Sequence, residues 1–201
     1  MYLCAINTLI KNDPRPFMRH PFICQKTQTI LLIIDEQAGL SPVISEFAEV
    51  VNNTEKLLKG ASLFDIPVVF TEQNPEKLGA TDPSLAHFMA TSCNIEKIHF
   101  SACLESNFIE SLSRFNRPQI VVAGTEAHVC VLQTCLDLLT ADFKLFIVDD
   151  AIASRNSHHK NIATKQLTQA GAIITCTESV LFQWLEKAGT EQFRALLPLI
   201  K

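Results

Sequence analysis

Residues 29–35 read Thr-Ile-Leu-Leu-Ile-Ile-Asp, an unbroken apolar run that stops at a carboxylate. A run of β-branched and aliphatic residues without polar alternation is typical of a strand buried on both faces. Shorter runs of the same kind recur along the chain, at residues 67–71, 119–124, 144–148 and 172–175. The sequence therefore predicts a sheet whose two faces are both covered by other elements.

Segments with the spacing of helices separate these runs, at residues 45–64, 104–115, 127–140, 158–170 and 178–188. Strands that alternate with helices imply a parallel sheet built from right-handed crossovers. We therefore expect one α/β domain over residues 27–201. The stretch 72–94 shows neither pattern, and its length favours a functional loop.

The composition argues against several classes of protein. The chain has 201 residues, 47% of them hydrophobic, which is too apolar for intrinsic disorder. No window of about 18 uninterrupted apolar residues is present, so we expect no membrane span. The formal net charge of −4 argues against a general nucleic-acid-binding surface. The six glycines are too far apart to form either a GxGxxG or a P-loop motif.

The cysteines and the first residues bear on location. Seven cysteines, an odd number without a CxxC pair, argue against a disulfide scaffold and favour a reducing compartment, so we expect a cytoplasmic protein. Residues 1–26 are rich in proline and basic groups, and we expect an N-terminal extension lying over the domain surface. Their charge follows the apolar run, unlike that of a secretory signal peptide; a mitochondrial leader remains an alternative.

Cys130 is the strongest candidate for chemistry. Ligands of parallel sheets bind beyond the carboxyl ends of the strands, and Cys130 follows the strand that ends at Gly124. In the first turn of the next helix, the positive helix end would lower the pKa of the thiol. The alternative is a buried, inert cysteine. The other six cysteines are expected to be structural or incidental.

Asp35 and Lys97 are candidates to act with this thiol. Asp35 closes the first buried strand, where a carboxylate is costly to desolvate unless it has a partner or a task. It would be a general acid or base, or alternatively a cap of the strand end. Lys97 would stabilise a thiolate and the negative charge of a transition state, or would be a solvated surface lysine.

Histidines offer rival arrangements. His99 and His128 could each form a Cys–His pair with the thiol. Asp82 and His87 share the long loop, but no second nearby histidine completes a three-ligand metal set. We therefore predict no metal and no other cofactor.

Five motifs, taken together, resemble a known family. In chain order they are IIDEQ at 33–37, TEQNPEKLG at 71–79, EKIHFS at 96–101, GTEAHVCVLQTCLDLL at 124–139 and TESVLFQWL at 177–185. Their order and spacing resemble those of the isochorismatase-like cysteine hydrolases, in the branch of isochorismatase domain-containing proteins. The resemblance begins at about residue 27 and implies a three-layer α/β sandwich with a six-stranded parallel sheet.

The resemblance also implies an active site. Carried over by motif, the catalytic triad is Asp35, Lys97 and Cys130. A cis peptide is expected between Thr125 and Glu126, and the backbone N–H groups of Glu126 and Cys130 would form an oxyanion hole. The expected substrate pocket is lined by side chains at the strand ends, Gln37, Glu72, Phe100 and His128.

The implied activity is hydrolysis of a small-molecule amide or related C–N bond through a thioester on Cys130. The metal ligands of the nicotinamidase branch have no counterpart here, and true isochorismatases lack the cysteine, so neither activity is expected. A non-catalytic interaction protein and a redox-sensing thiol protein are the alternatives. A ribonuclease, the function suggested for one member of the branch, has no supporting basic–aromatic stripe in this sequence.

The predicted helix 127–140 is apolar on nearly all sides. Val129, Leu132, Leu136 and Leu139 lie on one face and Val131, Cys135 and Leu138 on another, and one of the two faces is expected to cover the sheet. The other face needs cover as well, either from a neighbouring element or from a second subunit. Because the family is usually oligomeric, we expect a homo-oligomer.

Overall fold

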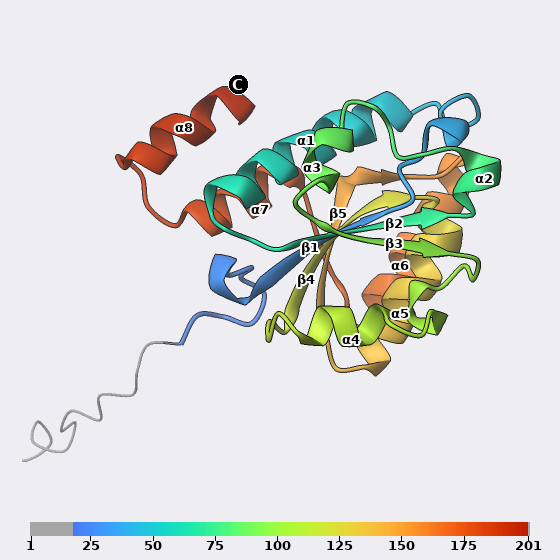
Figure 1. Cartoon of the computed structure of the whole chain (residues 1–201). Coiled ribbons are helices and arrows are strands. Elements are labelled where there is room, and N and C mark those ends of the chain that lie inside the picture. Colours follow the sequence, from blue (N-terminus) through green and yellow to red (C-terminus); the bar gives the residue numbers. More distant parts are fainter. Residues whose placement is uncertain (1–17, 201) are drawn as a thin grey trace, which may run out of the picture.

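In a computed structural model, which describes residues 18–200, six parallel strands form a single sheet (Figure 1). The strands are β1 Thr29–Ile34, β2 Val68–Gln73, β3 Cys93–Lys97, β4 Gln119–Thr125, β5 Lys144–Ala153 and β6 Ile173–Thr175. Their spatial order is β3-β2-β1-β4-β5-β6, and every neighbouring pair is parallel. The order reverses between β1 and β4, and ligand sites of such sheets lie at this switch point.

Helices cover both faces of the sheet, which completes the three layers expected from the sequence. They are α1 Phe47–Leu63, α2 Pro75–Leu78, α3 Ala86–Met89, α4 Phe108–Ser113, α5 Leu132–Thr140, α6 Ser157–Ala170, α7 Thr177–Leu185 and α8 Glu191–Ile200. Figure 1 shows α1, α7 and α8 on one face and α4, α5 and α6 on the other. The fold therefore leaves the strand ends open for a site.

The position of β1 in the middle of the sheet explains why its sequence does not alternate between apolar and polar residues. Leu31 and Ile33 belong to the core under α1 and α7, whereas Ile30, Leu32 and Ile34 belong to the core under α4, α5 and α6. All five side chains are fully buried. Each strand residue thus faces one of two cores, and either orientation requires an apolar side chain.

The observed elements differ from the predicted ones mainly where the chain is least apolar. The edge strand β3 was not predicted, because its residues Cys93–Lys97 include exposed Asn94 and Glu96. The stretch 72–94 is not one irregular loop, since it contains the short helices α2 and α3. Strand β5 also continues past residue 148 to Ala153, and helix α8 follows the last predicted element.

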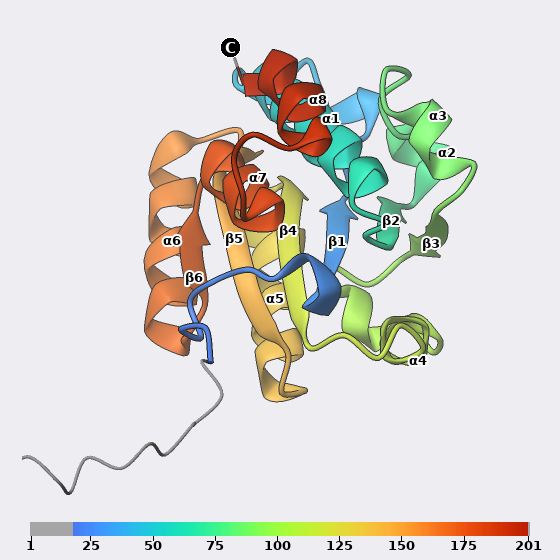
Figure 2. The same cartoon turned by 90° about the vertical axis from the view of Figure 1, so that its left-hand side faces the viewer.

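Part of the predicted extension packs on the domain. Cys24 is fully buried, its N–H donates to the Gln183 side chain at 2.7 Å, and its sulfur accepts from the Trp184 indole at 3.2 Å. Arg19 and Lys26 both pair with Glu186 of the segment after α7. Figure 2 shows this blue segment beside α7. The part of the predicted extension before residue 18 lies outside the described residues.

Three short 3-10 helices, Lys26–Gln28, Ala38–Leu40 and Ala102–Leu104, complete the connections near the sheet. Over residues 18–200, no helix has both the length and the apolar character needed to span a membrane.

Gly124 allows β1 and β4 to approach closely at the switch point. Its φ is +140°, and a Cβ atom there would lie 2.2 Å from the Ile34 carbonyl oxygen. This contact is with backbone, which cannot rotate away as a side chain would. Glycine is therefore required where β4 leads into the candidate site.

We predict that Gly124→Ala destabilises the fold by about 3 kcal/mol or more, because it adds a backbone clash to an unfavourable φ. Gly171→Ala is the matched control: its φ is also positive, at +106°, but nothing lies within 4 Å of the added Cβ. That control should lose only about 1 kcal/mol. Urea unfolding followed by circular dichroism measures both, and equal losses would contradict the close-approach argument.

Candidate active site

A buried ion pair joins the two charged residues that the sequence singled out. Asp35 directly follows β1, and Lys97 is the last residue of β3. The Lys97 Nζ lies 2.7 Å from the Asp35 Oδ2, and the two side chains are 0% and 1% exposed. The structure thus brings together two residues from strands that are separated by β2. The solvated-lysine alternative is wrong.

Strand β2 supports both members of this pair. The Thr71 hydroxyl donates to Asp35 Oδ1 at 2.7 Å, and the Lys97 ammonium donates to Gln73 Oε1 at 2.6 Å. Lys97 also donates to the Phe100 carbonyl at 3.3 Å. Asp35 Oδ2 faces the Lys97 ammonium. Burial of the two charges is therefore compensated by hydrogen bonds on each side.

The turn that carries Asp35 is fixed by the neighbouring strands. Asp35 has a left-handed φ of 52°, a conformation that aspartate tolerates better than most residues. Its N–H donates to the Thr71 carbonyl at 3.1 Å, and the Thr125 hydroxyl donates to its carbonyl at 2.6 Å. The carboxylate is consequently held at the end of β1, between β2 and β4.

Cys130 approaches the pair from the other side of the switch point. It lies in a π-helical turn, Ala127–Val131, that continues into α5, so Cys130 is in the first turn of the helical segment 127–140 as expected, but that turn is π-helical. Turns of this type occur often at functional sites. Cys130 is 7% exposed, and the Thr125–Glu126 peptide just before the turn is cis.

The pKa of the Cys130 thiol is raised to about 12, which is opposite to the lowering expected from the sequence. Burial is the largest cause, and the Asp35 carboxylate raises this pKa further, whereas Lys97 lowers it. The effects of burial and of the nearby carboxylate on the thiol pKa therefore outweigh the effect of a helix end. At neutral pH the resting site therefore holds a thiol, with a carboxylate next to it.

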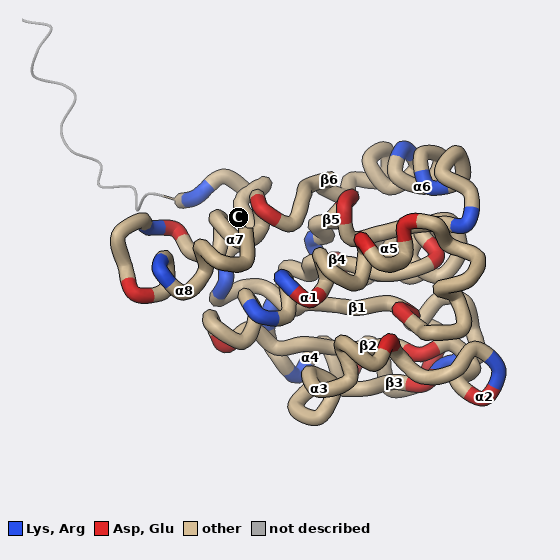
Figure 3. The backbone as a smooth tube through the Cα atoms, turned by 90° about the horizontal axis from the view of Figure 1, so that it is seen from above, with Lys and Arg blue, Asp and Glu red and all other residues tan. Residues whose placement is uncertain are grey.

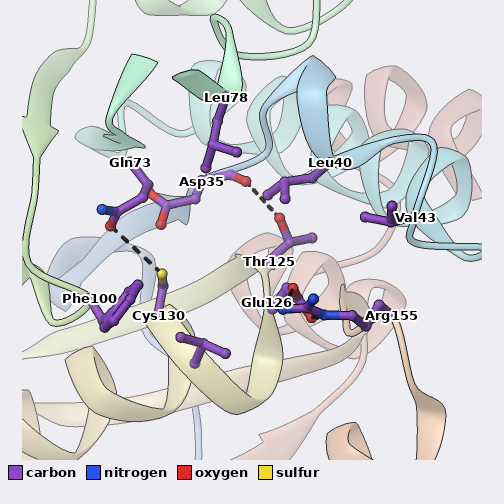
Figure 4. A pocket seen from close by; sticks show the side chains of 11 residues that line it. Asp35, Leu40, Val43, Gln73, Leu78, Phe100, Thr125, Glu126, Cys130 and Arg155 are labelled. Atoms are coloured by element: carbon purple, nitrogen blue, oxygen red, sulfur yellow. Dashed lines mark hydrogen bonds and ion pairs between the residues drawn. The ribbon is translucent and has the colours of Figure 1, made fainter. Parts of the chain in front are cut away.

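Gln73 is a site residue that sequence reasoning missed. Its Oε1 accepts from Lys97 and lies 4.0 Å from the Cys130 sulfur, and its Nε2 donates to the Ile98 carbonyl at 2.7 Å (Figure 4). The two-residue period of a strand could have identified it, since Thr71 and Gln73 share a face. The sequence prediction chose Glu72, which points to the opposite face.

A cavity of about 270 Å³ opens beside the sulfur (Figure 4). It is lined by residues from both sides of the switch point, Asp35, Leu40, Val43, Gln73, Leu78, Phe100, Thr125, Glu126, Val129, Cys130 and Arg155. Phe100 lines it as predicted from the sequence. Gln37, Glu72 and His128 are absent from the lining, so their placement at the pocket is wrong.

Gln37 and Glu72 instead hold the loop that frames the cavity. The Gln37 amide donates to the Gly79 carbonyl at 2.6 Å, and its Oε1 accepts from the Gln73 N–H at 2.7 Å. Glu72 Oε1 accepts from the backbone and hydroxyl of Thr81, at 2.6 and 2.7 Å. Both residues position the segment after β2, including the part that carries Leu78.

The histidines make contacts away from the thiol. His99 contacts Glu105 at 2.9 Å, and His128 contacts the Ser154 hydroxyl at 2.9 Å and stacks near His159. Burial lowers the pKa of His128. Within the part of the chain that the structure describes, no group of three or more His, Cys, Asp or Glu is placed to hold a metal ion.

Comparison with known proteins identifies the family of the chain. Residues 29–179 match the Isochorismatase domain. The isochorismatase domain-containing protein 2 of Danio rerio is 33% identical and covers 86% of each chain, and a secreted isochorismatase effector of Phytophthora sojae is 32% identical over 86% of this chain and 84% of its own. The chain therefore belongs to the isochorismatase family of hydrolases.

Solved structures share the fold. A MAR1 ribonuclease from Caenorhabditis elegans is 32% identical, with a TM-score of 0.82 over 88% of this chain and 91% of that one. YcaC from Pseudomonas aeruginosa, with hexane-2,5-diol and covalent acrylamide, is 26% identical, with a TM-score of 0.82 over 88% and 90%. The Escherichia coli YcaC product, an octameric hydrolase of unknown specificity, shares the fold at 22% identity, with a TM-score of 0.83 over 92% of both chains.

We predict opposite effects for the two charges beside the thiol. Asp35→Asn removes a cause that raises the pKa of Cys130, and Lys97→Met removes a cause that lowers it. At a fixed alkaline pH, iodoacetamide should therefore label Cys130 about tenfold faster in Asp35→Asn and more slowly in Lys97→Met. Peptide mass spectrometry from about pH 6 to about pH 11 measures the rates.

Lys59→Met provides the control, because Lys59 forms a surface ion pair with Glu55 at 3.0 Å. Its labelling rate should equal that of the unmodified protein. Shifts of the same sign in Asp35→Asn and Lys97→Met would contradict the proposed charge arrangement.

Proposed function

We propose that this protein is a cofactor-free cysteine hydrolase that cleaves a small amide or related C–N bond through a thioester on Cys130. The observation that carries this proposal is the Asp35–Lys97 ion pair, 2.7 Å long and fully buried, beside a cysteine at the base of a cavity. A nucleophile, an acid–base group and a cation next to a ligand-sized space are what acyl transfer needs.

In the first half of the proposed reaction, the Cys130 proton moves to Asp35 as the sulfur attacks the substrate carbonyl carbon. Lys97 stabilises the negative charge as it passes from the carboxylate, through the attacking sulfur, to the carbonyl oxygen. The carbonyl oxygen becomes an oxyanion, for which the backbone N–H groups of Glu126 and Cys130 are the proposed donors. The C–N bond breaks, the amine leaves with the Asp35 proton, and a thioester remains.

In the second half, Asp35 takes a proton from water as the water oxygen attacks the thioester carbonyl carbon. The C–S bond breaks, the sulfur recovers the proton from Asp35, and the carboxylic acid leaves. Each proton that Asp35 accepts is returned within the same half-reaction. The raised pKa of the resting thiol fits this scheme, because it makes transfer to Asp35 part of the reaction.

One neighbouring structure is consistent with a reactive nucleophile in this fold. Acrylamide is bound covalently in the Pseudomonas aeruginosa YcaC structure, and acrylamide is a small neutral amide that reacts with thiols. The cavity of about 270 Å³ admits a molecule of this size.

A redox-sensing role fits the site less well. Sensor cysteines have a low pKa and are accessible to solvent, whereas Cys130 is buried and its pKa is raised to about 12. An interaction protein without catalysis would not need a buried ion pair beside a thiol.

A ribonuclease is the second candidate, because the Caenorhabditis elegans relative carries that name. In the view of Figure 3, Lys and Arg are dispersed among Asp and Glu, and no continuous basic band is visible along the described residues drawn there. Binding of an RNA backbone favours such a band. RNA cleavage is therefore measured alongside amide turnover.

Self-association and a cytoplasmic location stay predictions. Val129, Leu132, Leu136 and Leu139 on the second face of the turn and helix around α5 are only half-buried, which leaves apolar surface for another subunit. The octameric Escherichia coli YcaC product supports the first prediction.

We predict that the protein releases ammonia from a member of a panel of small primary amides, and that Cys130→Ala abolishes this release. Asp35→Asn should lower turnover by about 10²- to 10⁴-fold, because it removes the group that carries the proton. Ammonia is measured with a coupled assay, and the acyl group on Cys130 is sought by intact-protein mass spectrometry. Cleavage of a fluorescent RNA is measured in parallel.

Cys103→Ala is the matched control, since Cys103 is a half-buried thiol away from the cavity, and it should retain full turnover. Amide turnover that persists in Cys130→Ala would contradict the mechanism. RNA cleavage lost in Cys130→Ala, without any amide turnover, would favour the second candidate instead.

A further inference from the structure

We propose that the cavity beside Cys130 selects electrically neutral substrates with a small apolar acyl group, and that the Glu126–Arg155 ion pair enforces this selection. This inference rests on the proposed function and names the substrate class for the same site. It comes from the balance of charges around the cavity, together with the apolar character of its walls.

Most of the cavity wall is aliphatic or aromatic. Its apolar members come from four separate segments, as Leu40, Val43, Leu78, Phe100 and Val129. The volume of about 270 Å³ lies just below the range of roughly 300–1,000 Å³ typical of pockets for drug-sized ligands. A small acyl group therefore fits, and burying its apolar surface favours binding.

Glu126 and Arg155 form the one polar wall away from the sulfur (Figure 4). Arg155 Nη2 lies 2.9 Å from Glu126 Oε1, and Arg155 Nε donates to Glu126 Oε2 at 3.2 Å. The Arg155 backbone N–H donates to the same oxygen at 3.2 Å. This two-pronged geometry is the strongest form of an arginine–carboxylate pair.

Burial is unequal within the pair. The Glu126 side chain is 7% exposed, whereas that of Arg155 is 60% exposed. The guanidinium at the cavity mouth therefore has its charge opposed by a buried carboxylate. His128 lies 3.6 Å from Glu126 Oε2, but burial lowers the pKa of its imidazole, which favours the neutral form.

All the charges around the cavity are thus matched. Asp35, which lines the cavity, is paired with the buried Lys97, and Glu126 is paired with the largely exposed Arg155. A substrate carboxylate would lose its hydration on entering the apolar cavity, which costs free energy. It would also be repelled by Glu126, which lies beside Arg155, the one cation among the described residues that line the cavity. A substrate ammonium would meet Arg155 in the same way. A neutral amide encounters neither repulsion.

The test compares alkylation of Cys130 by iodoacetamide and by iodoacetate, which share a leaving group and differ in charge. Peptide mass spectrometry gives both rates, and N-acetylcysteinamide provides the reference ratio for an unhindered thiol. We expect the preference of Cys130 for iodoacetamide to exceed the reference preference by about tenfold, the effect of one opposed charge at short range.

Two variants should move this preference in opposite directions. Glu126→Gln leaves Arg155 without its buried partner, so the preference for the neutral reagent should fall about tenfold. Arg155→Gln leaves Glu126 unpaired, so that preference should rise. Because Arg155 is largely exposed, its replacement keeps the test available if Glu126→Gln fails to fold.

Glu110→Gln is the matched control. It breaks the surface pair between Glu110 and Arg114, 2.7 Å apart in α4, and should leave the preference unchanged. A preference equal to the reference, or one that moves in the same direction in both variants, would overturn the selection by charge while leaving the proposed nucleophile intact. Failure of both reagents to label Cys130 at any pH would overturn the proposed function itself.

Discussion

The buried pair between Asp35 and Lys97 is the interaction on which the candidate site depends. Taking an ammonium and a carboxylate out of water costs several kcal/mol per ion, and their attraction offsets this only with good geometry and further hydrogen bonds. Strand β2 supplies those bonds through Thr71 and Gln73, from a position between β1 and β3. The order of three strands in the sheet is therefore also a requirement of the site.

The adjacent carboxyl groups of Asp35 and Glu36 show how strongly the neighbouring side chains determine the chemical role of a buried acid. Asp35 faces an ammonium at the cavity. The Glu36 carboxyl group is buried on the other side, where the Thr54 hydroxyl donates its only hydrogen bond from the described residues, at 2.6 Å, and burial raises its pKa well above the usual value. Burial thus favours the neutral form of Glu36, whose role is structural, although the sequence alone does not distinguish it from its neighbour.

The parts of the fold that depend on continuous apolar runs could be predicted from the sequence, as β1 shows, because burial on both faces admits little else. The edge strand β3 could not be predicted, because one side of it faces solvent and exposed polar residues alternate along it with less exposed residues. Contacts across the sheet, such as that of Gln73 with Lys97, depend on strand order. The pKa of Cys130 was predicted in the wrong direction, because burial and Asp35 cannot be weighed from spacing.

The site is built around a Cys130 side chain that rests as a thiol beside the Asp35–Lys97 pair. The most direct measurement is the ¹³Cβ chemical shift of Cys130, followed by NMR through a pH titration of protein labelled at cysteine, with Cys130→Ser to assign the signal. We expect the ¹³Cβ chemical shift of Cys130 to stay at the value of a neutral thiol from about pH 6 to about pH 10. A titration to thiolate with a midpoint below about pH 8 would contradict it.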